Sequence, residues 1–163
     1  MALTSKSTTT FLDHILQLYG DLVFDLCTSL LWNSNNAQIS FRSILKEIRR
    51  SVSEQRFEQF ERAWVLKIAC RKLRTHAVKY ARKLTPSEQI MLDASMNIEG
   101  RLKNFESYFH RLPVDDQILL LLRDKYGLPY HEIAATLVAS EGSLKLKRQA
   151  ALKCLDEWLW DKV

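Results

Sequence analysis

Apolar residues recur at steps of three and four along most of this 163-residue chain. Positions spaced in this way share one face of an α-helix, so the pattern predicts helices that each bury one side. The chain has only four glycines and three prolines, which are too few for a loop-rich β protein. We therefore expect an all-α fold. The longest apolar face comprises Phe11, Ile15, Leu18, Tyr19, Leu22, Val23, Leu26, Leu30 and Leu31.

Three helices are expected before residue 85. The first begins at Phe11 and ends at the Asn- and Ser-rich segment 33–36, because these residues favour turns and caps. The second spans 37–50, and the third runs from about residue 60 to Leu84. Proline disfavours helix in the residue before it, so Thr85-Pro86 ends the third helix. The apolar face of this helix consists of Phe60, Trp64, Ile68 and Leu73.

The C-terminal part carries the clearest helix signals. Helices are expected over Val114–Lys125, His131–Leu137 and Ser143–Trp160, and Gly142 lies in a turn at 139–142 before the last helix, where Ser143 can act as the cap. Three helices with a tight turn between the last two form the helix-turn-helix arrangement of many DNA-binding proteins.

These boundaries divide the chain into two small helical domains. We expect a flexible polar tail at 1–10, a first domain at 11–84, a linker at 85–108 and a helix-turn-helix domain at 109–163. Small domains are marginally stable unless their apolar content is high. The hydrophobic share of 47% meets that need.

The positive charge is concentrated in one part of the chain. The net charge is +5, and residues 96–163 carry equal numbers of basic and acidic residues, so the excess lies in residues 1–95. A basic stretch without acids attracts a polyanion such as DNA. The neutral second domain should bind DNA weakly by itself, because phosphate contacts dominate affinity. The basic stretch contains Lys67, Arg71, Lys72, Arg74, Lys79, Arg82 and Lys83.

Other classes of protein find little support in the sequence. Cys27, Cys70 and Cys154 are too widely spaced for a zinc site or a disulfide framework. No phosphate-binding loop, H-E-x-x-H motif or nucleophile elbow occurs, so we expect neither an enzyme nor a cofactor or metal. The N-terminus lacks the apolar core of a signal peptide, and no apolar run is long enough to span a bilayer. We expect a cytoplasmic protein.

The second domain resembles a known family. Its stretch LPVDDQILLLLRDKYGLPYHEIAATLVASEGSLKLKRQAALKCL is similar to region four of extracytoplasmic-function sigma factors, which typically reads LP-x-x-x-R, then L-R-x-x-x-G-x-x-Y-x-E-I-A, then S-E-G-T-V-K-x-R. The positions that match this pattern are Leu112-Pro113, Leu122-Arg123, Gly127, Tyr130, Glu132-Ile133-Ala134, Ser140-Glu141-Gly142-Ser143-Leu144-Lys145 and Leu155.

The resemblance implies that this domain contacts the minus-thirty-five promoter element. The helix start and Ser143 suit a phosphate, and Lys145, Lys147 and Arg148 would lie on the recognition helix in the major groove. The alternative interpretation of these basic residues is a solvated helix face. Lys147 replaces the usual Arg, and Ala150 and Leu152 replace residues that are often basic.

The first domain resembles region two of the same family. FERAWVLKIACRKLR is similar to the family stretch W-L-x-x-I-A-R-N, with matches at Trp64, Ile68 and Ala69. In this family the stretch melts and holds the minus-ten promoter element, which requires a basic groove and platforms for unstacked bases. The groove residues implied here are Lys67, Arg71, Lys72, Arg74 and Lys79.

The expected polymerase-binding segment departs from the family pattern. Relatives carry an acidic A-E-D-x-x-Q-E signature, whereas residues 37–43 lack the acids and contain Arg42. Charged contacts at the rim of an interface set partner choice. Docking on core RNA polymerase would therefore use a shifted, mainly apolar surface formed by Ile39, Phe41, Arg42 and Ile44.

The sequence thus favours an alternative sigma factor that binds core RNA polymerase and promoter DNA, with an anti-sigma protein as a further partner implied by the resemblance. No small-molecule substrate and no membrane are implied. Two alternatives stay open: a degenerate sigma-like regulator without promoter activity of its own, and a plain DNA-binding regulator that ignores polymerase.

Overall fold

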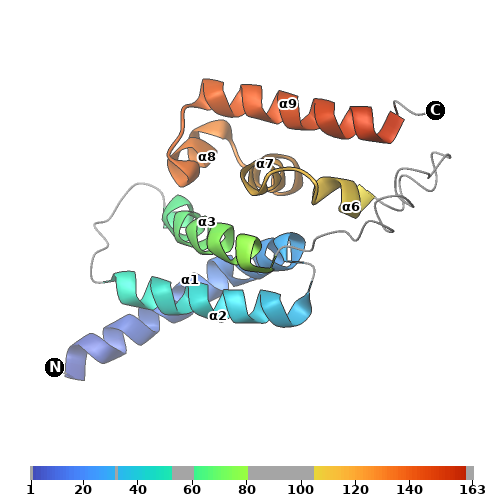
Figure 1. The fold of residues 1–163 in the computed structure, drawn as a ribbon. Coiled ribbons are helices and arrows are strands. Elements are labelled where there is room, and N and C mark those ends of the chain that lie inside the picture. The colour runs from blue at the N-terminus through green and yellow to red at the C-terminus, as the bar shows by residue number, and fades with distance from the viewer. Residues whose placement is uncertain (1, 32, 53–60, 81–104, 161–163) are drawn as a thin grey trace.

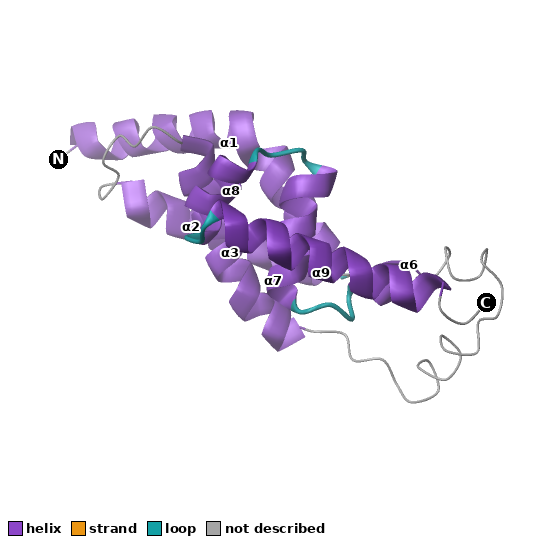
Figure 2. Cartoon of the chain, turned by 90° about the horizontal axis from the view of Figure 1, so that it is seen from above, coloured by secondary structure: helices purple, strands orange, loops and turns teal. Residues whose placement is uncertain are grey.

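The structure is a computed structural model that describes residues 2–31, 33–52, 61–80 and 105–160. All regular elements in these ranges are helices, as Figure 2 shows, and the all-α prediction is confirmed. In chain order they are α1 (Ala2–Leu30), α2 (Ser34–Ser51), α3 (Glu61–Tyr80), α6 (Phe105–Phe109), α7 (Val114–Leu120), the π-helical segment η2 (Leu121–Lys125), α8 (Tyr130–Leu137) and α9 (Glu141–Trp160).

The first three helices follow the expected pattern with shifted ends. Helix α1 begins at Ala2, before the expected start at Phe11, so residues 2–10 continue a helix where we expected a flexible tail. Each residue added to an existing helix gains a hydrogen bond, which helps polar residues to extend it. Asn33 caps α2, because its Oδ1 accepts hydrogen bonds from the backbone N–H groups of Asn35 (2.8 Å) and Asn36 (3.1 Å).

A short turn separates α8 from α9. Val138 ends α8 in the left-handed conformation, with φ 54°. Helix α9 begins at Glu141, two residues before the expected start. The side chain that caps it is that of Ser140, whose Oγ accepts a hydrogen bond from the Ser143 backbone N–H at 3.1 Å. The expectation that Ser143 is the cap is therefore wrong, because the helix starts earlier.

Helix α3 is the centre of the molecule. It lies between the pair α1 and α2 on one side and α7 and α8 on the other, and α9 covers the outer face of α7 and α8 (Figure 1). One hydrophobic cluster runs through these layers and includes Leu26, Ile44, Leu66, Ile118 and Ile133, all at most 1% exposed. Thus the described parts of the two expected domains share one core.

A second, smaller cluster holds the C-terminal end together. It joins α6 to α7 and α9 through Tyr108, Leu120, Ala151 and Leu155. Most of the expected linker, residues 85–104, lies outside the described residues. Among the helices that the structure describes, none has the length and apolar character needed to cross a bilayer.

Candidate nucleic-acid interface

Helix α9 buries one face and exposes the opposite one. Leu144, Ala151 and Leu155 face the core. Lys145 and Lys147, two of the predicted DNA-binding residues, are exposed. The Lys145 ammonium lies 5.3 Å from the centre of the Tyr130 ring, a cation–π contact between α9 and α8. The two lysines thus remain available to an external partner, with Lys145 partly oriented by Tyr130.

Arg148 does not share this outward face. Its Nη2 donates to Asp124 Oδ1 at 2.6 Å and its Nε donates to Asp124 Oδ2 at 2.9 Å. These hydrogen bonds raise the pKa of the Arg148 guanidinium above its ordinary value. In this conformation a carboxylate of η2 holds the Arg148 guanidinium, so DNA contact by Arg148 stays a prediction that requires this pair to open. Ser143 is half-buried in the first turn.

The outward face of α9 also contains residues that the sequence analysis did not select. Gly142, Leu146, Gln149 and Lys153 recur at steps of four, three and four and are all exposed, and Leu146 is 69% exposed. Helical periodicity could have identified this stripe once Leu144, Ala151 and Leu155 were known to be buried. The sequence analysis selected residues of this helix for their positive charge, and that criterion did not identify the stripe.

The predicted basic groove on α3 is divided between different neighbours. Arg71 and Lys72 both lie near Glu47 of α2, at 3.5 and 3.8 Å. The Arg74 Nε donates to Asp115 Oδ1 of α7 at 2.6 Å. Several cations of the cluster therefore lie beside carboxylates of the same chain, and Arg71 and Lys72 share the single charge of Glu47. Lys67 and Lys79 are exposed, whereas Arg82 and Lys83 lie outside the described residues.

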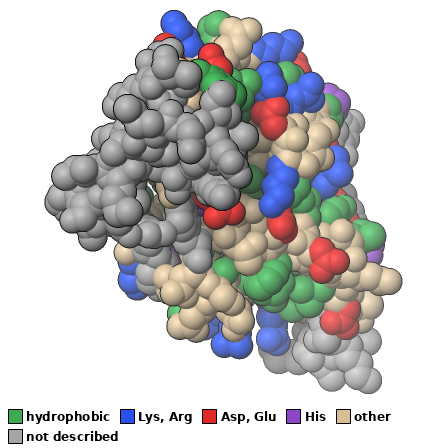
Figure 3. Space-filling model, turned by 90° about the vertical axis from the view of Figure 1, so that its right-hand side faces the viewer, with side chains coloured by type: hydrophobic (Ala, Val, Ile, Leu, Met, Phe, Trp, Pro, Cys, Tyr) green, Lys and Arg blue, Asp and Glu red, His purple; other side chains and the backbone are tan. Residues whose placement is uncertain are grey.

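One side of the molecule presents described charges of both signs (Figure 3). On the face shown in Figure 3, the described Lys and Arg side chains alternate with Asp and Glu side chains and surround a hydrophobic group. A strongly single-signed surface would attract DNA over a long range. The described part of this face offers a weaker, mixed field.

An ion pair with one buried partner joins α3 to α8. The Arg62 guanidinium donates two hydrogen bonds to the Glu132 carboxylate, and the one from Nη2 to Oε2 is 2.6 Å long. The Glu132 side chain is only 8% exposed, whereas that of Arg62 is 42% exposed. These hydrogen bonds raise the pKa of Arg62. Sequence reasoning used Glu132 only as a motif match and missed this pair, because its partners lie 70 residues apart.

A second polar cluster joins α1 to η2. Lys125 Nζ lies 2.8 Å from Asp25 Oδ2 and donates to Ser29 Oγ at 3.0 Å. The Tyr126 hydroxyl donates to Asp25 as well. Burial acts to raise the pKa of Asp25, but the hydrogen bonds and the charge of Lys125 outweigh burial and lower it. Burial and the Asp25 carboxylate raise the pKa of Tyr126.

The predicted polymerase-binding residues do not form one surface. Ile39 is 41% exposed and Arg42 is exposed. Phe41 is half-buried and packs edge-on against Phe24, with ring centres 5.3 Å apart. Ile44 is fully buried. Its assignment to a docking surface is wrong, because the helical period directs it into the core, and only Ile39, Arg42 and the edge of Phe41 face outward.

His76 has a structural environment on α3. His76 is half-buried and forms a hydrogen bond with the fully buried Ser40 of α2. Burial, followed by the nearby charges of Lys72 and Lys79, lowers the pKa of His76 below its ordinary value. His76 therefore favours the neutral form and helps to join α3 to α2.

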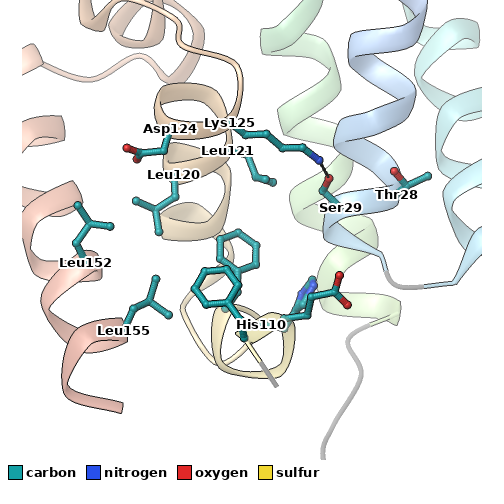
Figure 4. A pocket seen from close by; sticks show the side chains of 12 residues that line it. Thr28, Ser29, His110, Leu120, Leu121, Asp124, Lys125, Leu152 and Leu155 are labelled. Atoms are coloured by element: carbon teal, nitrogen blue, oxygen red, sulfur yellow. Dashed lines mark hydrogen bonds between the residues drawn. The ribbon is translucent and has the colours of Figure 1, made fainter. Parts of the chain in front are cut away.

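A cavity of about 610 Å³ lies where α1, α6, η2 and α9 meet (Figure 4). Leu120, Leu152 and Leu155 contribute apolar walls. Lys125 and Asp124 lie at its polar side, but the former is held by Asp25 and Ser29 and the latter by Arg148. Lys125 and Asp124 therefore already have protein partners within the described residues.

Metal binding and cysteine chemistry were considered for the described residues. No group of three or more His, Cys, Asp or Glu side chains there could hold a metal ion. Burial raises the pKa of the Cys27 and Cys70 thiols to about 12, so both are inert thiols of the core. A scan against protein-family models finds no match, and a search of curated proteins finds no significant relative.

Proposed function

We propose that this chain is a sigma-like transcription factor, which binds core RNA polymerase and directs it to promoter DNA. The observation that carries the proposal is the arrangement of α8 and α9. A turn of three residues, 138–140, joins the two helices, and α9 buries one face while it exposes Lys145 and Lys147. A helix-turn-helix protein requires such a pair, in which the second helix is free to enter the major groove.

The proposal gives each part of the molecule a role. Helix α9 would read the minus-thirty-five element, and α3 would contact the backbone near the minus-ten element. The exposed part of α2, at Ile39 and Arg42, would contribute to polymerase binding.

The spacing of promoter elements adds a physical requirement. Elements about 25 base pairs apart are separated by roughly 85 Å at 3.4 Å per base pair. Helix α9 has 20 residues and hence a length of about 30 Å, and it is joined to α3 through α8 and their shared core. The chain therefore has to separate its two parts when it spans both elements.

A second function is favoured by a specific observation. Arg74 pairs with Asp115, and Arg71 and Lys72 lie beside the Glu47 carboxylate of the same chain. A sigma-like regulator that remains closed, and acts through polymerase or another protein without a promoter of its own, fits this packing. A plain DNA-binding regulator would need only α8 and α9.

Purified chain, core polymerase and genomic DNA fragments test these functions together. A sigma-like factor will copurify with core polymerase and support discrete run-off transcripts. Core binding without specific transcripts favours the closed regulator, and DNA binding without core binding leaves only the plain regulator.

The recognition helix is tested by Lys145→Ala with Lys147→Ala. We expect the double variant to lose DNA affinity and to have a shallower salt dependence, because phosphate contacts release counterions. Lys46→Ala with Arg49→Ala removes the same charge from exposed positions of α2 and serves as the control. Equal effects of the two variants would refute the assignment of α9.

A further inference from the structure

We infer that the chain masks its own DNA-backbone contacts: Glu132 of α8 and Asp115 of α7 hold the guanidinium groups of Arg62 and Arg74 where DNA phosphates would otherwise bind. The inference rests on the proposed function, and it adds Arg62 to the DNA-binding residues together with a closed, inhibited state.

The Arg62–Glu132 contact has the geometry of an anion-binding site. Two guanidinium N–H groups face two oxygens of one carboxylate, and the same fork binds two oxygens of a phosphate. Arg62 itself is 42% exposed, so its guanidinium lies at the edge of the contact rather than inside the core. Once Glu132 moves away, a DNA backbone can reach Arg62.

Arg74 repeats this arrangement further along α3. Its Nε donates to Asp115 Oδ1 at 2.6 Å, and the two side chains are 42% and 63% exposed. Arg62 and Arg74 lie 12 positions apart on one helix, or about 18 Å at 1.5 Å per residue. Both carboxylates come from the second half of the chain, so one movement of that half releases both arginines.

Apolar contacts make the closed state a single body. Ile133 of α8 and Ile118 of α7 are 0% exposed and belong to the same cluster as Leu66 and Leu73 of α3. On the far side, Asp25 of α1 binds the η2 end through Lys125 and Tyr126. The apolar contacts thus hold the two halves together, and the polar pairs adjust how readily the halves separate.

Closure lowers the apparent affinity for DNA. When only the open form binds, the apparent Kd equals the intrinsic Kd divided by the fraction of open molecules. Weakening the two arginine–carboxylate pairs raises that fraction. It should therefore strengthen DNA binding by more than the change in net charge explains.

The test compares two variants of equal charge. Asp115→Asn with Glu132→Gln removes two negative charges from the α3 contact. Asp13→Asn with Asp21→Asn removes two from exposed positions of α1. We expect the first variant to bind a DNA duplex roughly tenfold more tightly than the control variant, the effect of losing two partly exposed ion pairs. X-ray scattering should show a larger radius of gyration for the first variant alone.

Further variants separate masking from other causes. Asp115→Asn alone changes an exposed side chain, keeps the fold intact, and should give two- to threefold tighter binding. Adding Arg62→Gln and Arg74→Gln to the variant with Asp115→Asn and Glu132→Gln should cancel its gain in DNA affinity. Expansion without tighter binding than the control overturns the masking inference alone. Absence of DNA binding by every variant overturns it together with the proposed function.

Discussion

The Arg62–Glu132 pair gives the sharpest quantitative test of how the two halves are joined. A double-mutant cycle with Arg62→Gln, Glu132→Gln and the double variant isolates the coupling free energy of the two side chains. Breaking a fully buried pair costs about 3–5 kcal/mol, and an exposed pair contributes about 0.2–1 kcal/mol. The Glu132 side chain is 8% exposed and that of Arg62 is 42% exposed, so the pair lies between these limits. We expect a coupling of about 1–2 kcal/mol.

Urea denaturation followed by circular dichroism measures this coupling. Each kcal/mol should also shift the melting temperature by roughly 2–4 °C in a protein of this size. The i,i+4 pair between Lys153 and Glu157 provides the control: the two side chains are 76% and 48% exposed, and the coupling there should not exceed about 0.5 kcal/mol. A coupling below about 0.3 kcal/mol for Arg62 and Glu132 would show that α8 is not held against α3 in this way.

Three further predictions follow from the described packing. Ile44→Ala should reduce the free energy of unfolding by about 2–5 kcal/mol in denaturant titrations. Ile39→Ala should change this free energy little and should weaken polymerase binding. Equal stabilities of the two variants would contradict the assignment of Ile44 to the core. The pKa of His76, followed by NMR, should lie below about 6.5. Protonation of His76 should therefore reduce the free energy of unfolding as the pH falls through the weakly acidic range. A normal pKa would contradict the burial of His76. Cys27 and Cys70 should resist alkylation in the native protein and react only after unfolding, and rapid native labelling would place them outside the core.

Much of the fold follows from local chemistry that the sequence displays. The apolar period of α1, the Asn-rich break before α2 and the turn before α9 are all found close to their expected positions. These features depend on residues only a few positions apart. The main local error concerned the cap of α9, where Ser140 and Ser143 compete for the same role and only the helix start decides between them.

The site was harder to predict because its contacts are distant in sequence. Arg148 and Lys147 are adjacent basic residues, yet one is held by Asp124 and the other is exposed. Periodicity gives the angle between two side chains on a helix but not which of them faces a partner helix. The pairs of Arg62 with Glu132 and Arg74 with Asp115 arise only when α3 meets α8 and α7, and no local pattern encodes that meeting.

The distance between α3 and α9 tests the central claim most directly. Spin labels or fluorophores at exposed Val78 and Lys153 report that distance in the free chain and in its complex with core polymerase and promoter DNA. The account predicts a single short distance for the free chain and an increase of several tens of ångströms in the complex, as the promoter spacing requires. An unchanged short distance in a complex that initiates transcription would contradict it.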